Sequence, residues 1–206
     1  FASEGLGSIY WHMVSKLLLA VQETVLRARA QGEPAATVGA LIDAYYDIRS
    51  GLGFNKAPDV YGAFPADPYS HTPAGQGAKQ PGMTGQVKEE ILARTAELGA
   101  FVEEGALYFD PLLLREGELA AEGGAFAYID AGGRERSIEL PPGSLAYTFC
   151  QTRVVYLRSG EDRIEVACAG GGLRRIDGLH LDPETSGRIF CRDGTVERIT
   201  VHLGPR

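Results

Sequence analysis

The stretch QPGMTGQVKEE, Gln80 to Glu90, marks the point where the character of the sequence changes. It ends a segment, residues 51–86, that holds seven glycines and five prolines and shows no hydrophobic period. It also begins a helical pattern, which we expect to run from Thr84 to Leu98. A long segment without a period inside a compact domain is typically functional or disordered, and its four large aromatic residues favour an ordered, functional loop.

Two further helices are predicted upstream of this loop. Apolar residues recur at helical spacing from Ser8 to Ala30, and a second helical pattern runs from Pro34 to Gly51. The short connection between them predicts antiparallel neighbours, and an up-down continuation makes the third helix parallel to the first. The apolar stripe of the first helix consists of Ile9, Met13, Leu17, Val21 and Val25, widened by Val14 and Leu18. On the third helix, Val87, Ile91 and Leu98 are predicted to face inward.

Beyond Gly99 the pattern changes to short alternating runs separated by turn signals such as PPGS and RSGED. Eight such runs at roughly ten-residue spacing are typical of an antiparallel β-sandwich or jelly roll. The predicted fold is therefore α+β, with a helical segment over residues 1–103 and an antiparallel β-sandwich over residues 104–206. The eight runs predicted to be strands are ALYFD, AFAYID, ERSIEL, SLAYTFC, TRVVYLR, DRIEVAC, GRIFC and VERITVHL. The AGGGL run, Ala169 to Leu173, is predicted to be a loop.

Composition limits the classes of function. The chain has 206 residues, 44% hydrophobic and 23% charged, which indicates globular material. Its net charge of −7 argues against a nucleic-acid or anionic-membrane surface. The three cysteines have no C-x-x-C spacing, so we expect neither a zinc site nor a disulfide framework, and a reducing cytoplasm fits best. The longest apolar run, Leu17 to Val21, is far shorter than the roughly 20 residues of a bilayer span.

The two parallel helices suggest an anion site. A helix start offers free backbone N–H groups and a partial positive charge, which suit a phosphate or a carboxylate. Thr84 adds a hydroxyl, Gly85 permits close approach to the backbone, and His12 adds a ring that donates hydrogen bonds. An alternative stays open for each residue: Thr84 as a simple N-cap, Gly85 as a loop residue and His12 as a buried, hydrogen-bonded histidine.

The series GSIYWH, GMTGQV and GALYFDP, in this order and spacing, resembles the closing part of the cellobiose phosphorylase family, the inverting glycoside phosphorylases of family 94. The resemblance covers residues 5 to about 111. It implies the terminal helices of an (α/α)₆ barrel followed by a jelly-roll domain, and it implies that His12, Thr84 and Gly85 bind inorganic phosphate, the attacking substrate. The general acid is expected on an earlier barrel helix, outside residues 1–206, so this chain alone should be inactive. The chain departs from the family pattern at QVKEE, where a tryptophan is usual, and at Trp11.

The expected partners are therefore a disaccharide or oligosaccharide and phosphate, with no other cofactor and no metal. Candidate sugar contacts are Trp11, Tyr69, His71 and Gln86. We assign structural roles to His180, Asp182 and His202, which are too few for a metal site. An uncovered apolar helix surface would favour a homodimer. Two other functions remain open: an inverting hydrolase on the same barrel, with Glu89 or Glu90 as a candidate base, and a non-catalytic glycan-binding or assembly module.

Overall fold

The protein is described by a computed structural model, which covers the backbone of residues 5–52 and 86–205 and the side chains of residues 13–52 and 88–205. The chain divides into two compact units, residues 1–96 and residues 97–206. The division falls before the boundary expected at residues 103 and 104. Leu98 already belongs to the second unit, where its carbonyl accepts a hydrogen bond from the Tyr156 hydroxyl at 2.5 Å.

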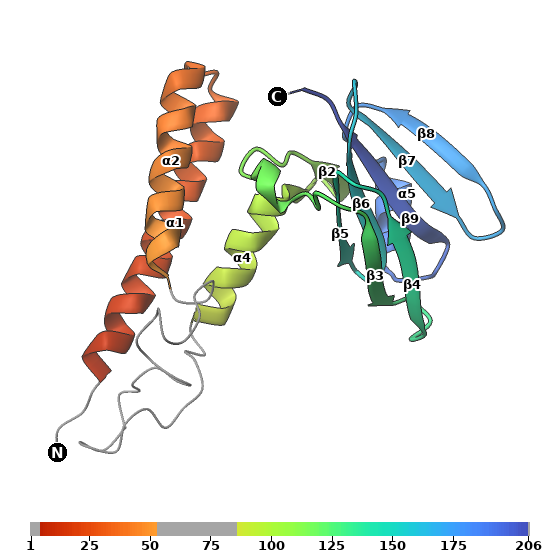
Figure 1. The fold of residues 1–206 in the computed structure, drawn as a ribbon, viewed down its shortest axis with the longest axis horizontal. Helices are drawn as coiled ribbons and strands as arrows, with labels where there is room; N and C mark the ends of the chain where they lie inside the picture. Colours follow the sequence, from red (N-terminus) through yellow and green to blue (C-terminus); the bar gives the residue numbers. More distant parts are fainter. Residues whose placement is uncertain (1–4, 53–85, 206) are drawn as a thin grey trace. The chain divides into compact units, whose positions relative to one another are not determined.

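The first unit contains the three predicted helices: α1 (Gly5–Ala30), α2 (Ala35–Gly51) and the larger part of α4 (Gln86–Leu98) (Figure 1). A tight turn joins α1 to α2. Gly32 takes a φ of 73° in this turn, and the Glu33 N–H donates to the Ala28 carbonyl at 3.0 Å. This arrangement ends α1 with a left-handed glycine and returns the chain alongside it, as the short connection predicts.

Two contacts establish the direction of α4 relative to α1. Lys16 Nζ lies 3.5 Å from Glu89 Oε1, and Gln22 Nε2 donates to the Ala93 carbonyl at 3.2 Å. Because both partners advance together along their helices, α1 and α4 run parallel. The predicted parallel orientation of the first and third helices is confirmed.

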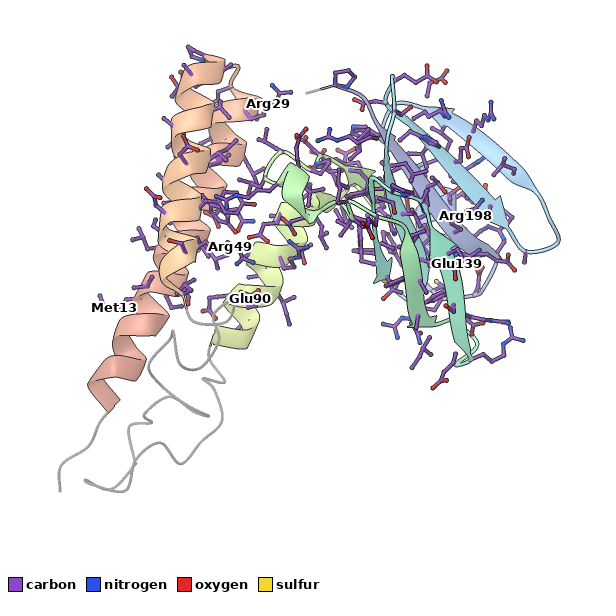
Figure 2. All side chains as sticks on the ribbon, viewed as in Figure 1. Met13, Arg29, Arg49, Glu90, Glu139 and Arg198 are labelled. Atoms are coloured by element: carbon purple, nitrogen blue, oxygen red, sulfur yellow. The ribbon has the colours of Figure 1, made fainter. Side chains whose placement is uncertain are left out.

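The buried faces of these helices agree with the predicted ones only in part. On α1, Leu18 and Val25 of the predicted stripe are buried, but Met13 and Leu17 are exposed (Figure 2 labels Met13), and the polar Gln22 is buried as well. On α4, Ile91 is 60% exposed, and the buried positions are instead Ala93, Ala96 and Glu97. The small side chains of Ala93 and Ala96 let α4 approach α1 closely enough for the hydrogen bond from the Gln22 amide to the Ala93 carbonyl, so this face of α4 is buried.

The second unit is built around a mixed five-stranded sheet in the order β5-β6-β9-β7-β8. Its strands are β5 (Ser144–Phe149), β6 (Thr152–Arg158), β7 (Arg163–Cys168), β8 (Leu173–Asp177) and β9 (Val196–Leu203). Two antiparallel hairpins accompany it, formed by β1 (Ala100–Glu103) with β2 (Ala106–Phe109) and by β3 (Gly124–Ile129) with β4 (Glu135–Leu140). A short 3₁₀ turn, η2 (Glu116–Glu118), lies between the hairpins in the sequence.

The α+β class and the antiparallel hairpins agree with the prediction, but the sheet is not wholly antiparallel. Strands β6 and β9 pair in parallel, from Arg153 with Arg198 to Arg158 with Leu203. The predicted strand GRIFC is wrong, because its residues Gly187 to Phe190 end the helix α5 (Pro183–Phe190). Residues 169–172 form the turn between β7 and β8, as predicted for most of AGGGL, but Leu173 already begins β8, a strand that was not predicted.

The five-stranded sheet has one apolar face and one polar face. Alternate residues of β6, β7 and β9 form the core together with Leu107, Phe109 and Ile189, so the β1–β2 hairpin and α5 cover the apolar face (Figure 1). The Leu107 N–H donates to the buried Ser186 hydroxyl at 2.9 Å, which attaches β2 to α5. The intervening residues of the strands, among them Arg153, Glu165 and Thr200, form the other face, where the β3–β4 hairpin lies.

Candidate functional site

A polar seam of ion pairs joins α4 to both α1 and α2 in the first unit. Besides the Lys16–Glu89 ion pair, Arg49 Nη1 near the end of α2 lies 3.6 Å from Glu90 Oε2 near the start of α4 (Figure 2). The carboxylate of Glu89 is largely buried, with 12% of the side chain exposed. Both acids considered as bases for hydrolysis therefore lie against a cation from a neighbouring helix.

The residues predicted to bind phosphate come shortly before the seam residues Lys16 and Glu89 in the sequence. His12 belongs to α1, but its side chain lies outside the described residues, as does that of Trp11. Thr84 and Gly85 also lie outside the described residues, and Gln86 is the first residue of α4. Because α1 begins at Gly5 and not at Ser8, the backbone N–H groups near His12 are inside the helix. The predicted alignment of the start of α1 with His12 is therefore wrong, because the free N–H groups of α1 belong to its first turn, which begins at Gly5.

The loop residues Tyr69 and His71, predicted to contact sugar, lie outside the described residues. Lys88, near the start of α4, is exposed.

The second unit holds a cleft that sequence reasoning missed. It has a volume of about 420 Å³ and lies between the β3–β4 hairpin, the β5–β6 turn and the start of β9. Polar side chains dominate its lining, and three of them are arginines. Its lining includes the side chains of Tyr128, Asp130, Arg134, Arg136, Gln151, Arg153 and Glu197.

Asp130 organises the hairpin side of the cleft. One carboxylate oxygen, Oδ1, accepts the N–H groups of Gly132 at 2.9 Å and Arg134 at 3.0 Å, and Oδ2 accepts Arg136 Nε at 2.8 Å. The Arg134 N–H and then the Arg136 guanidinium lower the pKa of Asp130 to about 2. The carboxylate is therefore charged throughout the neutral range and holds Arg136 at the rim.

On the sheet side, Arg153 is held by an aromatic ring. Its Nη1 donates to the Tyr128 hydroxyl at 2.7 Å, and its guanidinium carbon lies 5.7 Å from the centre of the Tyr128 ring. Its Nε is buried without a hydrogen-bond acceptor, and the same is true of Nε in Arg198, its register partner on β9 (Figure 2 labels Arg198). Among the described residues, neither of these arginines forms an ion pair.

Two local features shape the floor of the cleft. The turn between β5 and β6 consists of Cys150 and Gln151, with φ values of 48° and 62°, where a two-residue hairpin usually places asparagine and glycine. The pairing of β9 with β7 shifts register between Ala167 and Cys168, so that Glu197 is an extra residue of the β9 strand. Both irregularities fall at residues that line the cleft.

The other polar residues singled out in the sequence lie elsewhere and have structural contacts. The His180 ring stacks on Tyr108, with centroids 5.0 Å apart. Asp182 caps α5, where Oδ1 accepts the Thr185 N–H at 2.8 Å and Arg174 Nη2 lies 2.7 Å from Oδ2. His202 Nε2 lies 3.7 Å from Glu165 Oε2. No group of three or more metal-binding side chains occurs among the described residues.

None of the helices within the described ranges has the length and hydrophobicity of a membrane span. No model of a known protein family matches this sequence, and no curated protein matches it significantly. The assignment of a function therefore rests on the resemblance of the short motifs and on the geometry given above.

Proposed function

We propose that the chain supplies the phosphate-binding half of the active site of a carbohydrate-active enzyme resembling the inverting glycoside phosphorylases. In this proposal α1, α2 and α4 are the last helices of an (α/α)₆ barrel, and the second unit is the β domain that follows the barrel. The substrates are a β-linked disaccharide or oligosaccharide and inorganic phosphate, and the product is a sugar 1-phosphate.

The observation that carries the proposal is the parallel alignment of α1 and α4. Their ion pair joins Lys16 to Glu89. One helical turn before Lys16 in the sequence is His12, and one turn before Glu89 is Gly85. A helix start brings free N–H groups and a positive dipole end to that level, and both favour an oxyanion. The alignment thus supports a phosphate held by the His12 ring, the Thr84 hydroxyl and the backbone at Gly85.

The proposed reaction is a single displacement with inversion. A phosphate oxygen attacks the anomeric carbon while the glycosidic C–O bond breaks and a general acid protonates the leaving oxygen. The resemblance places that acid outside residues 1–206. The role of this chain is then to hold the nucleophile in line with the anomeric carbon. Such positioning lowers the activation barrier substantially.

An inverting hydrolase on the same barrel needs a carboxylate base that activates water. Glu89 and Glu90 are the candidates near the seam, and each already lies against a cation, Lys16 and Arg49 respectively. This pairing favours phosphorolysis over hydrolysis. In the complete catalytic domain, sugar release that requires phosphate would distinguish phosphorolysis from hydrolysis.

Phosphate binding to the full chain, measured by calorimetry, tests the proposal. We expect His12→Ala and Thr84→Val each to weaken binding about tenfold, a loss of about 1.4 kcal/mol. Thr95→Val is the matched control: it makes the same replacement in α4, where the exposed Thr95 hydroxyl donates to the Ile91 carbonyl of its own helix. Absence of phosphate binding by a chain with intact helical circular dichroism would overturn the proposal, as would equal weakening in Thr95→Val.

A further inference from the structure

The arginines of the second-unit cleft differ in how far their charges are compensated. Arg134 Nε lies 3.4 Å from Asp130 Oδ2, and Arg136 Nε lies 2.8 Å from the same oxygen. Arg153, within the described part of the chain, has only the Tyr128 hydroxyl as a hydrogen-bond partner. The lining therefore carries three guanidinium groups against the two carboxylates of Asp130 and Glu197, in a protein whose net charge is −7.

A second positive charge lies beside Arg153. Arg198 is its register partner on the adjacent parallel strand, so the two side chains project from the same face of the sheet. Like charges at such neighbouring positions destabilise a sheet unless something compensates them. No carboxylate pairs with either residue among the described residues, and the Nε of each is buried without an acceptor.

We propose that this cleft is a binding site for a small ligand carrying an oxyanion group, a carboxylate or a phosphate, which Arg153 contacts with support from Arg136 and Arg198. A guanidinium presents paired N–H donors whose spacing matches the two oxygens of such a group. The volume of about 420 Å³ falls in the range of about 300 to 1,000 Å³ usual for small-molecule sites. The site is separate from the phosphate site proposed on the helices and does not depend on it.

The ligand is expected to be polar over its whole surface. The Tyr128 ring lies under Arg153 and is the aromatic side chain in the cleft lining, while Gln151, Ser137 and Glu197 surround the rest of the lining with hydrogen-bonding groups. An acidic sugar or a sugar phosphate has this combination of an oxyanion and many hydroxyls. A purely apolar carboxylate would leave these polar side chains unpaired, which costs free energy.

The test uses the full chain and three probes: D-glucuronate, glucose 6-phosphate and neutral glucose. Binding is followed through the arginine Nε–H resonances of the labelled protein, because Arg153 Nε is buried without an acceptor and its signal should report a change at the guanidinium group. We expect one or both charged probes to shift the Arg153 signal, glucose to leave it unchanged, and salt to weaken the effect. A response to glucuronate alone identifies a carboxylate ligand, and a response to glucose 6-phosphate alone identifies a phosphate ligand.

Matched variants separate charge from folding. Arg153→Met should weaken binding at least tenfold, and Arg198→Met should weaken it several-fold. Tyr128→Phe removes the same 2.7 Å hydrogen bond but keeps the guanidinium, so binding should change by less than about threefold. Arg188→Met removes a positive charge from the surface of α5 and Thr84→Val removes the hydroxyl of the proposed phosphate site, and neither should alter this binding. Failure of both charged probes to bind, or an equal loss in Arg188→Met, refutes the site.

Discussion

Gly99 is the residue on which the junction between α4 and β1 depends. Its φ is 66°, and a Cβ atom at this position would lie 2.2 Å from the backbone carbonyl of Asp110. The Asp110 N–H also donates to the Gly99 carbonyl at 2.8 Å, so the two segments are in close contact. Only glycine meets both requirements, the left-handed backbone and the close approach of a second chain segment.

We therefore expect Gly99→Ala to lower the free energy of unfolding of the second unit by about 3 kcal/mol or more. Gly105→Ala is the matched control, because Gly105 has a φ of 79° but no neighbouring atom within 4 Å of the place that an alanine methyl group would occupy. It should cost about 1 to 2 kcal/mol, the backbone strain alone. Denaturant unfolding of both variants measures the difference, and equal losses would show that the contact with Asp110 has no role.

At the scale of elements, helix α5 shows both what the sequence predicts and where it misleads. The run GRIFC alternates like a strand, yet Asp182, Pro183 and Glu184 just before it form an N-cap, a first-turn proline and a first-turn acid. The cap signal was present and decides the structure, because α5 buries Ile189 and Ser186 against the sheet and β2. Most other elements followed from hydrophobic period and turn residues, but the short strands β1 and β8 correspond to none of the predicted runs.

The cap gives a prediction that depends on pH. The hydrogen bond from the Thr185 N–H is the largest of the effects that lower the pKa of Asp182 to about 2, against about 3.9 in an unfolded chain. The stabilisation from this carboxylate is therefore complete above about pH 4 and is lost as the pH falls toward 2. At pH 7 we expect Asp182→Ala to cost about 1 kcal/mol, and this cost should shrink in acid.

Asp182→Asn serves as the control, since asparagine keeps a capping oxygen but cannot titrate. Its unfolding free energy at pH 7 should fall by only a few tenths of a kcal/mol, and its decline in acid should be less steep than that of the unaltered protein. Chemical unfolding at several pH values distinguishes these cases. A loss in Asp182→Ala that stays constant from pH 7 to 2 would contradict the assigned cap.

At the scale of the whole molecule, sites assembled from distant segments were the hardest to predict. The parallel helices followed from a short connection, but the cleft brings together Asp130, Gln151, Arg153 and Glu197 from three parts of the chain. None of these four residues belongs to a sequence motif or a spacing that indicates a binding site. Only the parallel pairing of β6 with β9 places Arg198 beside Arg153, and no local pattern predicts that pairing.

The division into two units predicts which fragment folds alone. All of the buried cluster around Tyr156, Ile164 and Ile199 comes from residues 100–203, so residues 97–206 should unfold cooperatively as an isolated fragment. A fragment of residues 104–206, cut at the boundary that the sequence suggested, lacks β1 and the Leu98 carbonyl that accepts the Tyr156 hydroxyl. We expect it to be less stable by about 2 kcal/mol or more, or roughly 8 °C in Tm for a domain of this size.

Calorimetric unfolding of the two fragments measures this difference. The longer fragment should also retain the response of Arg153 to the charged probes, because every residue that lines the cleft lies between Tyr128 and Glu197. Equal stability of the two fragments would mean that the strand β1 and the end of α4 add nothing to the second unit. A longer fragment that does not fold would mean that the core of residues 100–203 depends on the helical unit, and the two units would then have to be treated as one domain.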